Sequence, residues 1–319
     1  MPQNALQIPV VTLTLNPALD MSSVVAALIP DHKLRCSDPL LDPGGGGLNV
    51  SRAIAALGGE SLALVALGGL TGDRLAGLIR EEGVPFLALT APGETRQSLT
   101  VTEASTGRQY RFMLPGPVWS DLDQERVFTL LRASARPGAF GVISGSQPPG
   151  VPVDFPARLA RAMPGLNVVL DTSGPALREA VDHPIPDLRI LRMDDAEAEA
   201  LSKTALISRS DTADFAQSLV DGGVASQVVI SRGAEGSVLV DRHHRIFAKA
   251  AKVKVVSTVG AGDSFVAGLV LALARGETPE AALSLGSAAA SAAVMTDATQ
   301  LCRVEDVMRL LPECVISQV

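Results

Sequence analysis

The chain has 319 residues, of which 47% are hydrophobic and only 3% aromatic, and its formal net charge is −7 at pH 7. This size and composition predict one large domain whose core consists mainly of aliphatic side chains. The acidic balance excludes a basic nucleic-acid-binding surface, and the longest apolar run, FVAGLVLALA, falls well short of the about 20 residues that span a membrane.

Short β-rich runs alternate with helical patterns along most of the chain. The strand-like runs are residues 10–15, 61–68, 139–145, 167–171, 188–193 and 226–233. Several of them are apolar throughout, which is typical of strands covered by helices on both faces. The alternation predicts an α/β fold with a mainly parallel central sheet.

The helical patterns lie between these strands and continue beyond them. They cover residues 48–57, 72–82, 121–135, 153–163, 194–202, 211–221, 262–275, 278–293 and 304–311. Gly58, Gly83 and Gly276 follow three of these patterns directly. We expect each of these glycines to end its helix in the left-handed conformation.

Two segments interrupt the alternation. Residues 95–115 alternate apolar and polar side chains on both sides of a short turn at residues 105–107, which predicts a β-hairpin. Residues 20–43 have an extended rather than a helical pattern. Together these segments predict a small β flap, or lid, inserted into a single domain that spans residues 1–319.

A lone carboxylate, Asp263, stands where a helix is predicted to begin in VSTVGAGDSFVAGLV. A helix N-terminus offers unpaired N–H groups and the positive end of the helix dipole, and both bind anions. Asp263 could therefore accept the proton of an attacking hydroxyl while the backbone of Gly260, Ala261 and Gly262 holds a transferring phosphoryl group. The dipole predicts a depressed pKa for the Asp263 carboxyl. The alternative is an ordinary first-turn acid that stabilises the helix.

A second glycine run lies in DPGGGGLNVSRAIAALGG, before another helical pattern. Four consecutive glycines exceed what a turn requires and predict close approach of the backbone to a ligand, with a flexible turn as the alternative. Asn49, just beyond them, offers a donor and an acceptor to a sugar hydroxyl. The run lacks the Gly-x-Gly-x-x-Gly spacing of a dinucleotide site, and the chain contains no Gly-x-x-x-x-Gly-Lys-Ser/Thr phosphate loop.

Cations gather in and near the predicted lid. They are Lys33, Arg35, Arg96, Arg108 and Arg111. In a protein of net negative charge, such cations near the glycine run are suited to gather a phosphorylated substrate, and arginine can contact its phosphate in a bidentate manner. The alternative for each single residue is a solvated surface charge. The five cations together are therefore stronger evidence for a phosphate site than any one of them.

Two loops after strand-like runs offer places for a metal and a nucleotide. Asp194 and Glu197, in MDDAEAE, follow a strand, where open α/β sheets bind ligands, and their carboxylates could hold magnesium directly or through water. The alternative is a solvated first turn of a helix. Ser231, Gly233 and Gly236 surround a loop between two strand-like runs, which suits either a tight turn or a nucleotide phosphate or ribose.

The cysteines and the N-terminus indicate the compartment. Cys36, Cys302 and Cys314 are odd in number and widely spaced, which favours a reduced, cytoplasmic environment. The segment MPQNALQIPVVTLTL lacks the basic-then-apolar layout of a signal peptide, in keeping with that expectation. The four histidines show neither metal-ligand nor nucleophile spacing.

With both glycine motifs in this order, the chain resembles the ribokinase-like (phosphofructokinase B type) sugar kinase family. GGGGLNVSRAIAALGG is similar to the family's N-terminal sugar-site signature, and STVGAGDSFVAG is similar to its C-terminal catalytic signature. Within the family the resemblance is closest to the phosphosugar kinases, on TLTLNPALD, KLRCSDPLLDPGGGG, TRQSLTVTEASTGRQYRFMLPG and SGSQPPGV, and it covers essentially the whole chain. It implies a three-layer sandwich with a β lid that closes over the sugar, and a homodimer in which two lids pair.

The resemblance also implies roles for individual residues. Asp263 would activate the sugar hydroxyl, and the backbone of residues 260–262 would form the anion hole. The sugar would be held by Asp20, Gly45, Gly46, Asn49 and Ser146, and its existing phosphate by Lys33, Arg35 and Arg96. ATP would contact Ser231, Gly233, Gly236, Ser257 and Val259, with magnesium near Asp194 and Glu197.

Two stretches depart from the family pattern. Where the family shows Lys-Pro-Asn-x-x-Glu, this chain has RMDDAE at 192–197, so Asp194 replaces an asparagine and adds charge near the nucleotide phosphates. In TDATQLC, Thr296, Ala298 and Gln300 replace Asn-x-Gly-x-Arg, near the potassium site of a related enzyme. Whether this chain needs potassium is therefore left open.

These expectations combine into one leading prediction, a magnesium-ATP kinase that converts fructose 6-phosphate to fructose 1,6-bisphosphate. The nearest alternatives are a 1-phosphofructokinase and a tagatose-6-phosphate kinase, because each substrate offers one phosphate and one free primary hydroxyl. A non-catalytic sugar-phosphate or nucleotide-binding protein is the alternative outside enzymes, and the altered segment 192–196 is the feature that favours it. The lack of a dinucleotide fingerprint argues against a dehydrogenase.

Overall fold

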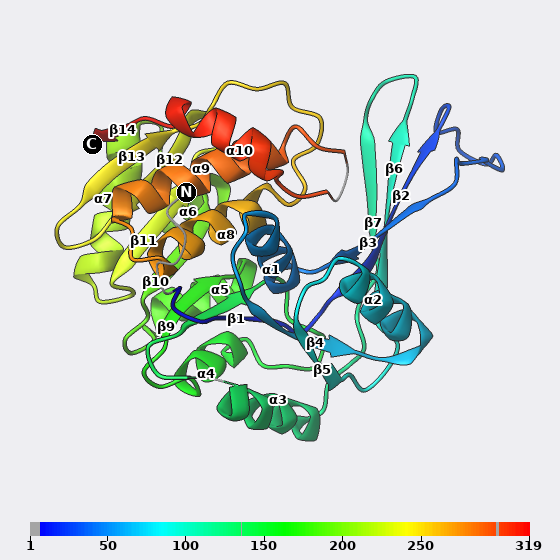
Figure 1. Cartoon of the computed structure of the whole chain (residues 1–319), viewed down its shortest axis with the longest axis horizontal. Helices are drawn as coiled ribbons and strands as arrows, with labels where there is room; N and C mark the ends of the chain where they lie inside the picture. The colour runs from blue at the N-terminus through cyan, green and yellow to red at the C-terminus, as the bar shows by residue number, and fades with distance from the viewer. Residues whose placement is uncertain (1–6, 135, 298–299) are drawn as a thin grey trace.

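The computed structural model of the chain describes residues 7–134, 136–297 and 300–319. Within this part of the chain, a 10-stranded sheet lies between two layers of helices, and a separate 4-stranded sheet projects from one end (Figure 1). Every helix among the described residues is too short or too polar to cross a membrane.

The large sheet contains strands from the whole length of the chain. In chain order they are β1 (Val10–Thr14), β4 (Leu62–Leu67), β5 (Phe86–Thr90), β8 (Phe140–Ser144), β9 (Asn167–Asp171), β10 (Ile190–Asp194), β11 (Gln227–Ser231), β12 (Gly236–Val240), β13 (Arg245–Lys249) and β14 (Ile316–Gln318). Their spatial order is β14-β13-β12-β11-β10-β9-β8-β1-β4-β5. All pairs from β5 to β11 are parallel, whereas β12, β13 and β14 form an antiparallel edge. The predicted mainly parallel sheet is thus confirmed.

Helices cover both faces of this sheet. On one face lie α1 (Gly46–Ala56), α8 (Ala261–Ala274), α9 (Pro279–Ala293) and α10 (Val304–Leu310), and on the other lie α3 (Asp121–Ser134), α4 (Phe155–Arg161), α5 (Gly174–Asp182), α6 (Asp195–Ser202) and α7 (Arg209–Asp221). Strand side chains alternate between two separate cores, since Val168 and Leu170 belong to one and Val169 to the other. This alternation explains why the strands are apolar throughout.

All predicted helices are present, and each of the three glycines expected to end one has a positive φ. The values are 69° for Gly58, 70° for Gly83 and 77° for Gly276. Helix α5 and strands β5, β13 and β14 were not predicted. The patterns of α5, β5 and β14 are weak, because α5 buries only Leu177 and Ala180, three of the five residues of β5 are exposed, and β14 has 3 residues.

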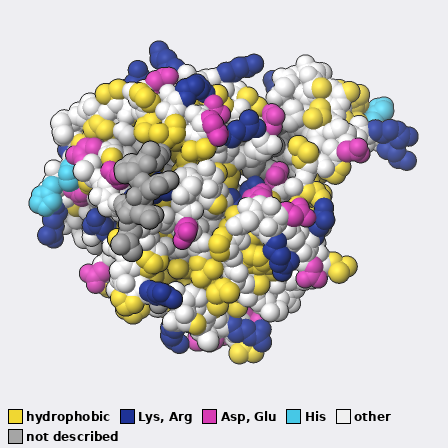
Figure 2. Space-filling view, viewed as in Figure 1, with side chains coloured by type: hydrophobic (Ala, Val, Ile, Leu, Met, Phe, Trp, Pro, Cys, Tyr) yellow, Lys and Arg dark blue, Asp and Glu magenta, His cyan; other side chains and the backbone are white. Residues whose placement is uncertain are grey.

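The small sheet, hereafter the lid sheet, combines two distant segments. Its strands are β2 (Ala18–Val25), β3 (Leu40–Gly44), β6 (Arg96–Glu103) and β7 (Gln109–Met113), in the order β3-β2-β6-β7. The predicted hairpin is confirmed by the antiparallel pair β6–β7, whereas β2 and β6 run parallel. Helix α2 (Gly69–Glu81) packs against β2 and β3 at the base of the sheet. The lid sheet extends to the upper right in Figure 1 and forms a separate lobe in Figure 2.

Candidate active site

The carboxylate of Asp263 lies in the first turn of α8. The helix begins after Gly260, whose φ of 73° is left-handed and whose added Cβ would lie 2.6 Å from Leu301 Cδ2. Glycine is therefore required at this corner. The first backbone N–H groups of a helix have no acceptor within it, so the N–H groups of residues 261–263 and the Asp263 carboxylate occupy the same helix end.

The expectation of a depressed pKa for Asp263 is wrong. Its pKa is raised to about 6, chiefly by burial and also by the nearby carboxylate of Asp171. The hydrogen bond from Asn49 and the charges of Arg192 and Arg52 act in the opposite direction. Loss of hydration thus outweighs the helix dipole, and the carboxylate becomes basic enough at neutral pH to take up a proton.

The glycine run of residues 44–47, whose last two members begin α1, makes close contacts with the protein itself. An added Cβ on Gly46 would lie 2.5 Å from Ser144 Oγ, and one on Gly47 would lie 2.4 Å from the Leu13 carbonyl oxygen. Gly45 precedes the helix with a φ of 127°. The glycines therefore let the start of α1 lie against the ends of β1 and β8, a packing reason that the sequence did not reveal.

This packing joins the two glycine motifs. Asn49 Nδ2, from α1, donates a hydrogen bond of 2.8 Å to Asp263 Oδ2, from α8, across 214 residues of sequence. Both side chains are only partly exposed. The predicted sugar-site residue and the predicted base are therefore direct neighbours.

Three further residues expected at the sugar are connected at the base of the lid sheet. Ser98 Oγ donates to Asp20 Oδ1 over 2.7 Å, and burial raises the pKa of Asp20 while the charge of Arg96 opposes that shift. Arg96 Nε donates to the Asn16 carbonyl oxygen over 3.1 Å, and Asn16 Nδ2 donates to Ser146 Oγ over 3.1 Å. Asn16, which no sequence pattern indicated as a site residue, thus links Arg96 to Ser146.

The other predicted cations lie farther out on the lid sheet. Lys33 and Arg35 are exposed on the loop of residues 26–39 that connects β2 and β3, and Arg108 is exposed in the β6–β7 hairpin. Lys and Arg side chains gather at the outer end of the lid lobe in Figure 2. Arg111 Nη2 approaches Thr258 Oγ1, just before α8, at 3.5 Å. Arg96 is therefore the expected phosphate ligand that already lies beside Asp20.

Arg192, in the middle of β10, connects the predicted nucleotide loop to the start of α8. Its Nη2 donates to Ser231 Oγ over 3.2 Å and its Nη1 to Asp171 Oδ1 over 3.1 Å. An added Cβ on Gly262 would lie 3.1 Å from Arg192 Nη1. Within the described residues its buried Nε has no hydrogen-bond partner. A guanidinium group thus faces the helix end that carries Asp263.

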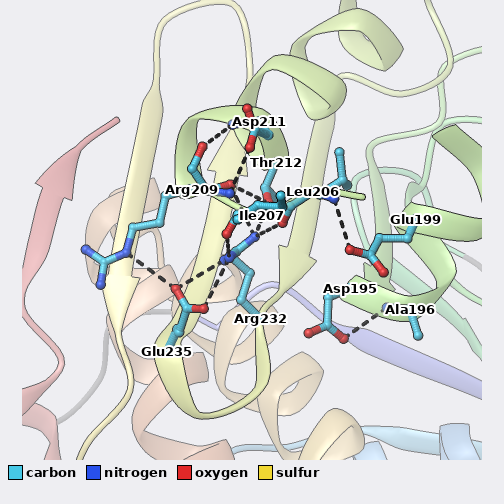
Figure 3. Close-up of polar contacts among 11 residues, drawn as sticks. Asp195, Ala196, Glu199, Leu206, Ile207, Arg209, Asp211, Thr212, Arg232 and Glu235 are labelled. Carbon is cyan, nitrogen blue, oxygen red and sulfur yellow. Dashed lines mark hydrogen bonds and ion pairs between the residues drawn. The ribbon is translucent and has the colours of Figure 1, made fainter. Parts of the chain in front are cut away.

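The predicted nucleotide loop is a tight turn between β11 and β12. A 3₁₀ turn spans Gly233–Glu235, and Gly236 has a φ of 138°, with an added Cβ only 2.0 Å from the Ala248 carbonyl oxygen. Arg232 is 7% exposed and anchors the turn by donating to the carbonyl oxygens of Leu206 and Ile207, each at 2.9 Å (Figure 3).

The remaining nucleotide residues, Ser257 and Val259, lie in the segment that leads into α8. Val259 N donates to Ser257 Oγ over 3.2 Å. The backbone N–H groups of Val256 and Ser257 both donate to the Val294 carbonyl oxygen, at 2.7 and 3.3 Å. These bonds fix the segment immediately before the anion hole against the end of α9.

Asp194 and Glu197 form a capping box at the start of α6. Asp194 Oδ1 accepts from Glu197 N over 2.8 Å, and Glu197 Oε2 accepts from Asp194 N over 2.9 Å. The described residues contain no cluster of three or more His, Cys, Asp or Glu that could enclose a metal. The second oxygen of each carboxylate still suits a hydrated magnesium ion held mainly by nucleotide phosphates, so the site fits magnesium bound through water.

The structure describes only part of the segment expected near a potassium site. Thr296 Oγ1 lies 2.8 Å from the Ala293 carbonyl oxygen and 2.7 Å from that of Gln300. Ala298 lies outside the described residues.

Comparison with known proteins identifies the family. Residues 7–306 match the pfkB family of carbohydrate kinases. The chain belongs to this family. The predicted ribokinase-like fold and the resemblance to phosphofructokinase B type kinases are thereby confirmed.

Several of the matching relatives are phosphofructokinases. The ATP-dependent 6-phosphofructokinase isozyme 2 of Mycobacterium tuberculosis is 39% identical over 302 residues, which cover 94% of this chain and 88% of the relative. The isozyme 2 of Escherichia coli is 38% identical over 94% of this chain and 96% of its own length. The 1-phosphofructokinase of Bacillus subtilis is 32% identical over 96% of this chain and 99% of its own length. A crystal structure of the E. coli phosphofructokinase-2 with fructose-6-phosphate matches with a TM-score of 0.89 at 36% identity, over 96% of this chain and 99% of that one.

Three charged residues of this site, Asp171, Arg192 and Arg52, were not predicted as site residues from the sequence of this pfkB family member. Asp171 ends the apolar strand NVVLD, as Asp194 ends the next one, so the rule applied to Asp194 would have found it. Arg192 lies in the stretch that departs from the family motif, and no pattern there indicates a site residue. Arg52 follows Asn49 by one helical turn inside an apolar pattern, which was its only signal.

Proposed function

We propose that this kinase transfers the γ-phosphoryl group of ATP to the free primary hydroxyl of fructose 6-phosphate. The observation that carries the proposal is the contact between Asn49 and Asp263 at the N-terminus of α8. It supports the proposal because a carboxylate, a helix N-terminus and an amide side chain lie together, and we assign them as proton acceptor, anion hole and sugar ligand. The relatives at 39% and 38% identity, both 6-phosphofructokinases, support the choice of substrate.

In the proposed reaction the Asp263 carboxylate accepts the proton of the sugar hydroxyl while the oxygen of that hydroxyl attacks the γ-phosphorus. The bond between the γ-phosphorus and the bridging oxygen breaks, and ADP leaves. The N–H groups of Gly260, Ala261 and Gly262 would stabilise the charge that accumulates on the phosphoryl group, and the Arg192 guanidinium would help to compensate it. Phosphoryl transfer depends mainly on such positioning, so a rigid helix end suits it.

The sugar phosphate would bind between α1 and the lid sheet. Asp20, Ser146, Asn49 and the backbone of residues 45–46 would hold the sugar. Arg96 would contact its phosphate, because it is partly buried beside Asp20 and provides the planar donors that phosphate accepts. Lys33 and Arg35, on the exposed loop, would complete the phosphate site when the lid sheet closes.

ATP would lie along the ends of β10 and β11. Ser231, Gly233, Gly236, Ser257 and Val259 would contact it, and Asp194 and Glu197 would hold magnesium through water. Magnesium neutralises phosphate charge when it is bound with the nucleotide.

A panel of phosphosugars with magnesium-ATP tests this proposal. Turnover of fructose 6-phosphate in preference to fructose 1-phosphate and tagatose 6-phosphate is the expected result. Preference for fructose 1-phosphate would favour the alternative represented by the 32% identical relative. Binding without turnover of any of them would instead identify a non-catalytic binding protein.

We also propose a homodimer through the lid sheet. Met21, Leu99 and Phe112 are in register across β2, β6 and β7 and so share one face. Phe112 is 51% exposed, and Met21 and Leu99 are half-buried. A row of apolar side chains across a narrow projecting sheet suits pairing with the same row of a second copy.

A further inference from the structure

Arg52 is a buried cation, and each of its three guanidinium nitrogens donates to a specific acceptor. It lies one helical turn after Asn49 in α1 and is 8% exposed. Its Nε and Nη2 donate to the two carboxylate oxygens of Glu82 over 2.6 and 2.7 Å. Its Nη1 donates to the Pro43 carbonyl oxygen over 2.7 Å and to Asn49 Oδ1 over 3.2 Å.

This arrangement determines which end of the Asn49 amide faces Asp263. A guanidinium group has donors only, so the amide oxygen must point toward Arg52. The amide nitrogen is then left to donate to the Asp263 carboxylate. A reversed amide would present its oxygen to that carboxylate, which would favour the protonated carboxyl over the charged base.

We propose that Arg52 is a positioning residue, which holds the Asn49 amide in the orientation that donates to Asp263 and ties this orientation to lid strand β3 through the Pro43 carbonyl. The inference rests on the proposed function, in which Asp263 is the base. Arg52 itself touches no reacting atom. Through its Nη1 it contacts both Pro43, in the lid sheet, and Asn49, which donates to the proposed catalytic base Asp263.

The charges around Asp263 predict how loss of Arg52 would be observed. Asp263 faces Asn49 and Arg52 from α1, Asp171 from β9 and Arg192 from β10. Loss of Arg52 removes a positive charge and frees the Asn49 amide to rotate, and both changes raise the pKa of Asp263. Activity that requires the charged carboxylate should then fail at a higher pH than in the wild type.

A double-mutant cycle with a pH profile tests the inference. We expect Arg52→Met to lower kcat on the order of 10-fold to 100-fold, with less than about a 3-fold change in KM for fructose 6-phosphate. The acid limb of the pH profile of kcat should move to a higher pH by about half a unit to one unit. Arg52→Met combined with Asn49→Leu should lose no more kcat than Asn49→Leu alone, because Arg52 acts through the amide. Arg80→Met, an exposed arginine on α2, is the matched control and should leave the profile unchanged.

An unshifted acid limb or additive losses in the cycle would overturn the inference, because a merely structural arginine would lower stability without either effect. If Arg52→Met does not fold, Arg52→Lys is used in the same cycle, since an ammonium group cannot reach Pro43, Glu82 and Asn49 together in this planar arrangement. An active wild type with an inactive Asp263→Asn variant upholds the proposed function even when the inference about Arg52 fails.

Discussion

At the scale of single residues, the decisive property is the environment of one carboxyl. The position of Asp263 at a helix start could be predicted from its glycines, but its pKa could not, because burial depends on side chains distant in sequence. Asp171 and Asn49 reach it from other elements and act in opposite directions. The four glycines at the start of α1 are a similar case, since an added Cβ on Gly46 or Gly47 would meet the ends of β8 and β1, and one on Gly44 would meet the Asp20 carboxylate of β2.

Replacing the base should separate activity from stability. Asp263→Asn should lower kcat by about 1,000-fold or more with a modest change in KM, since a base acts mainly in the transition state. Asp195→Asn, an exposed first-turn acid of α6, is the control and should retain activity in the same steady-state assay. An Asp263→Asn variant with near wild-type kcat would exclude this carboxyl as the base.

The same substitution should stabilise the folded protein above pH 6. The pKa of Asp263 is 3.8 in the reference state and about 6 when folded, so ionisation opposes folding. That penalty is absent below the unfolded pKa and fully present above the folded one. Asp263→Asn removes it, and we expect a gain of about 1–2 kcal/mol at pH 8, allowing for partial exposure, and none at pH 4. Thermal unfolding at both pH values measures this, and an equal change at both would contradict it.

The raised pKa also predicts a pH dependence of turnover. The base must be ionised, so kcat should fall as the pH decreases through about 6 and approach a plateau above it. Saturating fructose 6-phosphate is required, because its own phosphate titrates near pH 6 and affects binding. A kcat that stays constant down to pH 5 would show that no group of this pKa controls the reaction.

At the scale of helices and strands, the sequence predicted the elements with a regular apolar pattern and missed those that are short or have a weak pattern. Apolar strands such as 167–171 and helices with glycine ends were found because burial on both faces and left-handed termini leave local patterns. Strand β14 and helix α5 lack such a pattern. The capping box of α6 was open to two interpretations, because the same carboxylates suit a helix start and a hydrated metal.

Packing of α8 on α9 depends on two glycines that face each other. An added Cβ on Gly268 would lie 2.8 Å from the Leu285 carbonyl oxygen and 3.0 Å from Gly286 Cα. Gly268→Ala should therefore reduce the free energy of unfolding by roughly 1–3 kcal/mol. Gly77→Ala on α2, where a Cβ meets nothing within 4 Å, should instead raise it by about 0.5–1 kcal/mol. Urea unfolding measures both, and changes of the same sign would contradict this account.

The turn between β11 and β12 depends on Arg232. Arg232→Ala would leave the carbonyl oxygens of Leu206 and Ile207 without their donor and free the turn that we assign to ATP. We expect KM for ATP to rise about 10-fold while KM for fructose 6-phosphate changes little. Arg242→Ala, an exposed arginine in the next turn, serves as the control. An unchanged KM for ATP would place the nucleotide elsewhere.

At the scale of the whole molecule, the contacts that were hardest to predict join segments that are far apart in the sequence. The three-layer body follows from strand-helix alternation, and its fold could be predicted. The meeting of Asn49 with Asp263, and of β2 with β6, could not be derived from local pattern, because each joins segments whose separation in sequence carries no such signal. The resemblance to a family implied only that both Asn49 and Asp263 act on the sugar, and not that their side chains are in direct contact.

The proposed dimer makes a prediction at this scale. Phe112→Asp places a charge in the apolar row of the lid sheet and should convert a dimer into a monomer, because an unpaired charge is costly in an apolar interface. Val153→Asp, at a residue 49% exposed just before α4, is the control and should leave the mass unchanged. Light scattering at several concentrations measures this, and a monomeric wild type would reject the dimer.

The parallel pairing of β2 with β6 also affects how the protein forms. Ser98 bonds to Asp20 across 78 residues, so β2 and β3 leave the ribosome long before β6 is made. A two-stranded hairpin alone is marginally stable in water, and contacts of long sequence separation form slowly. The sheet that we assign to sugar binding therefore completes itself only after the first α/β units have been synthesised. N-terminal fragments that end before β7 should expose β2 to proteases, and fragments that include β7, which ends at Met113, should protect it.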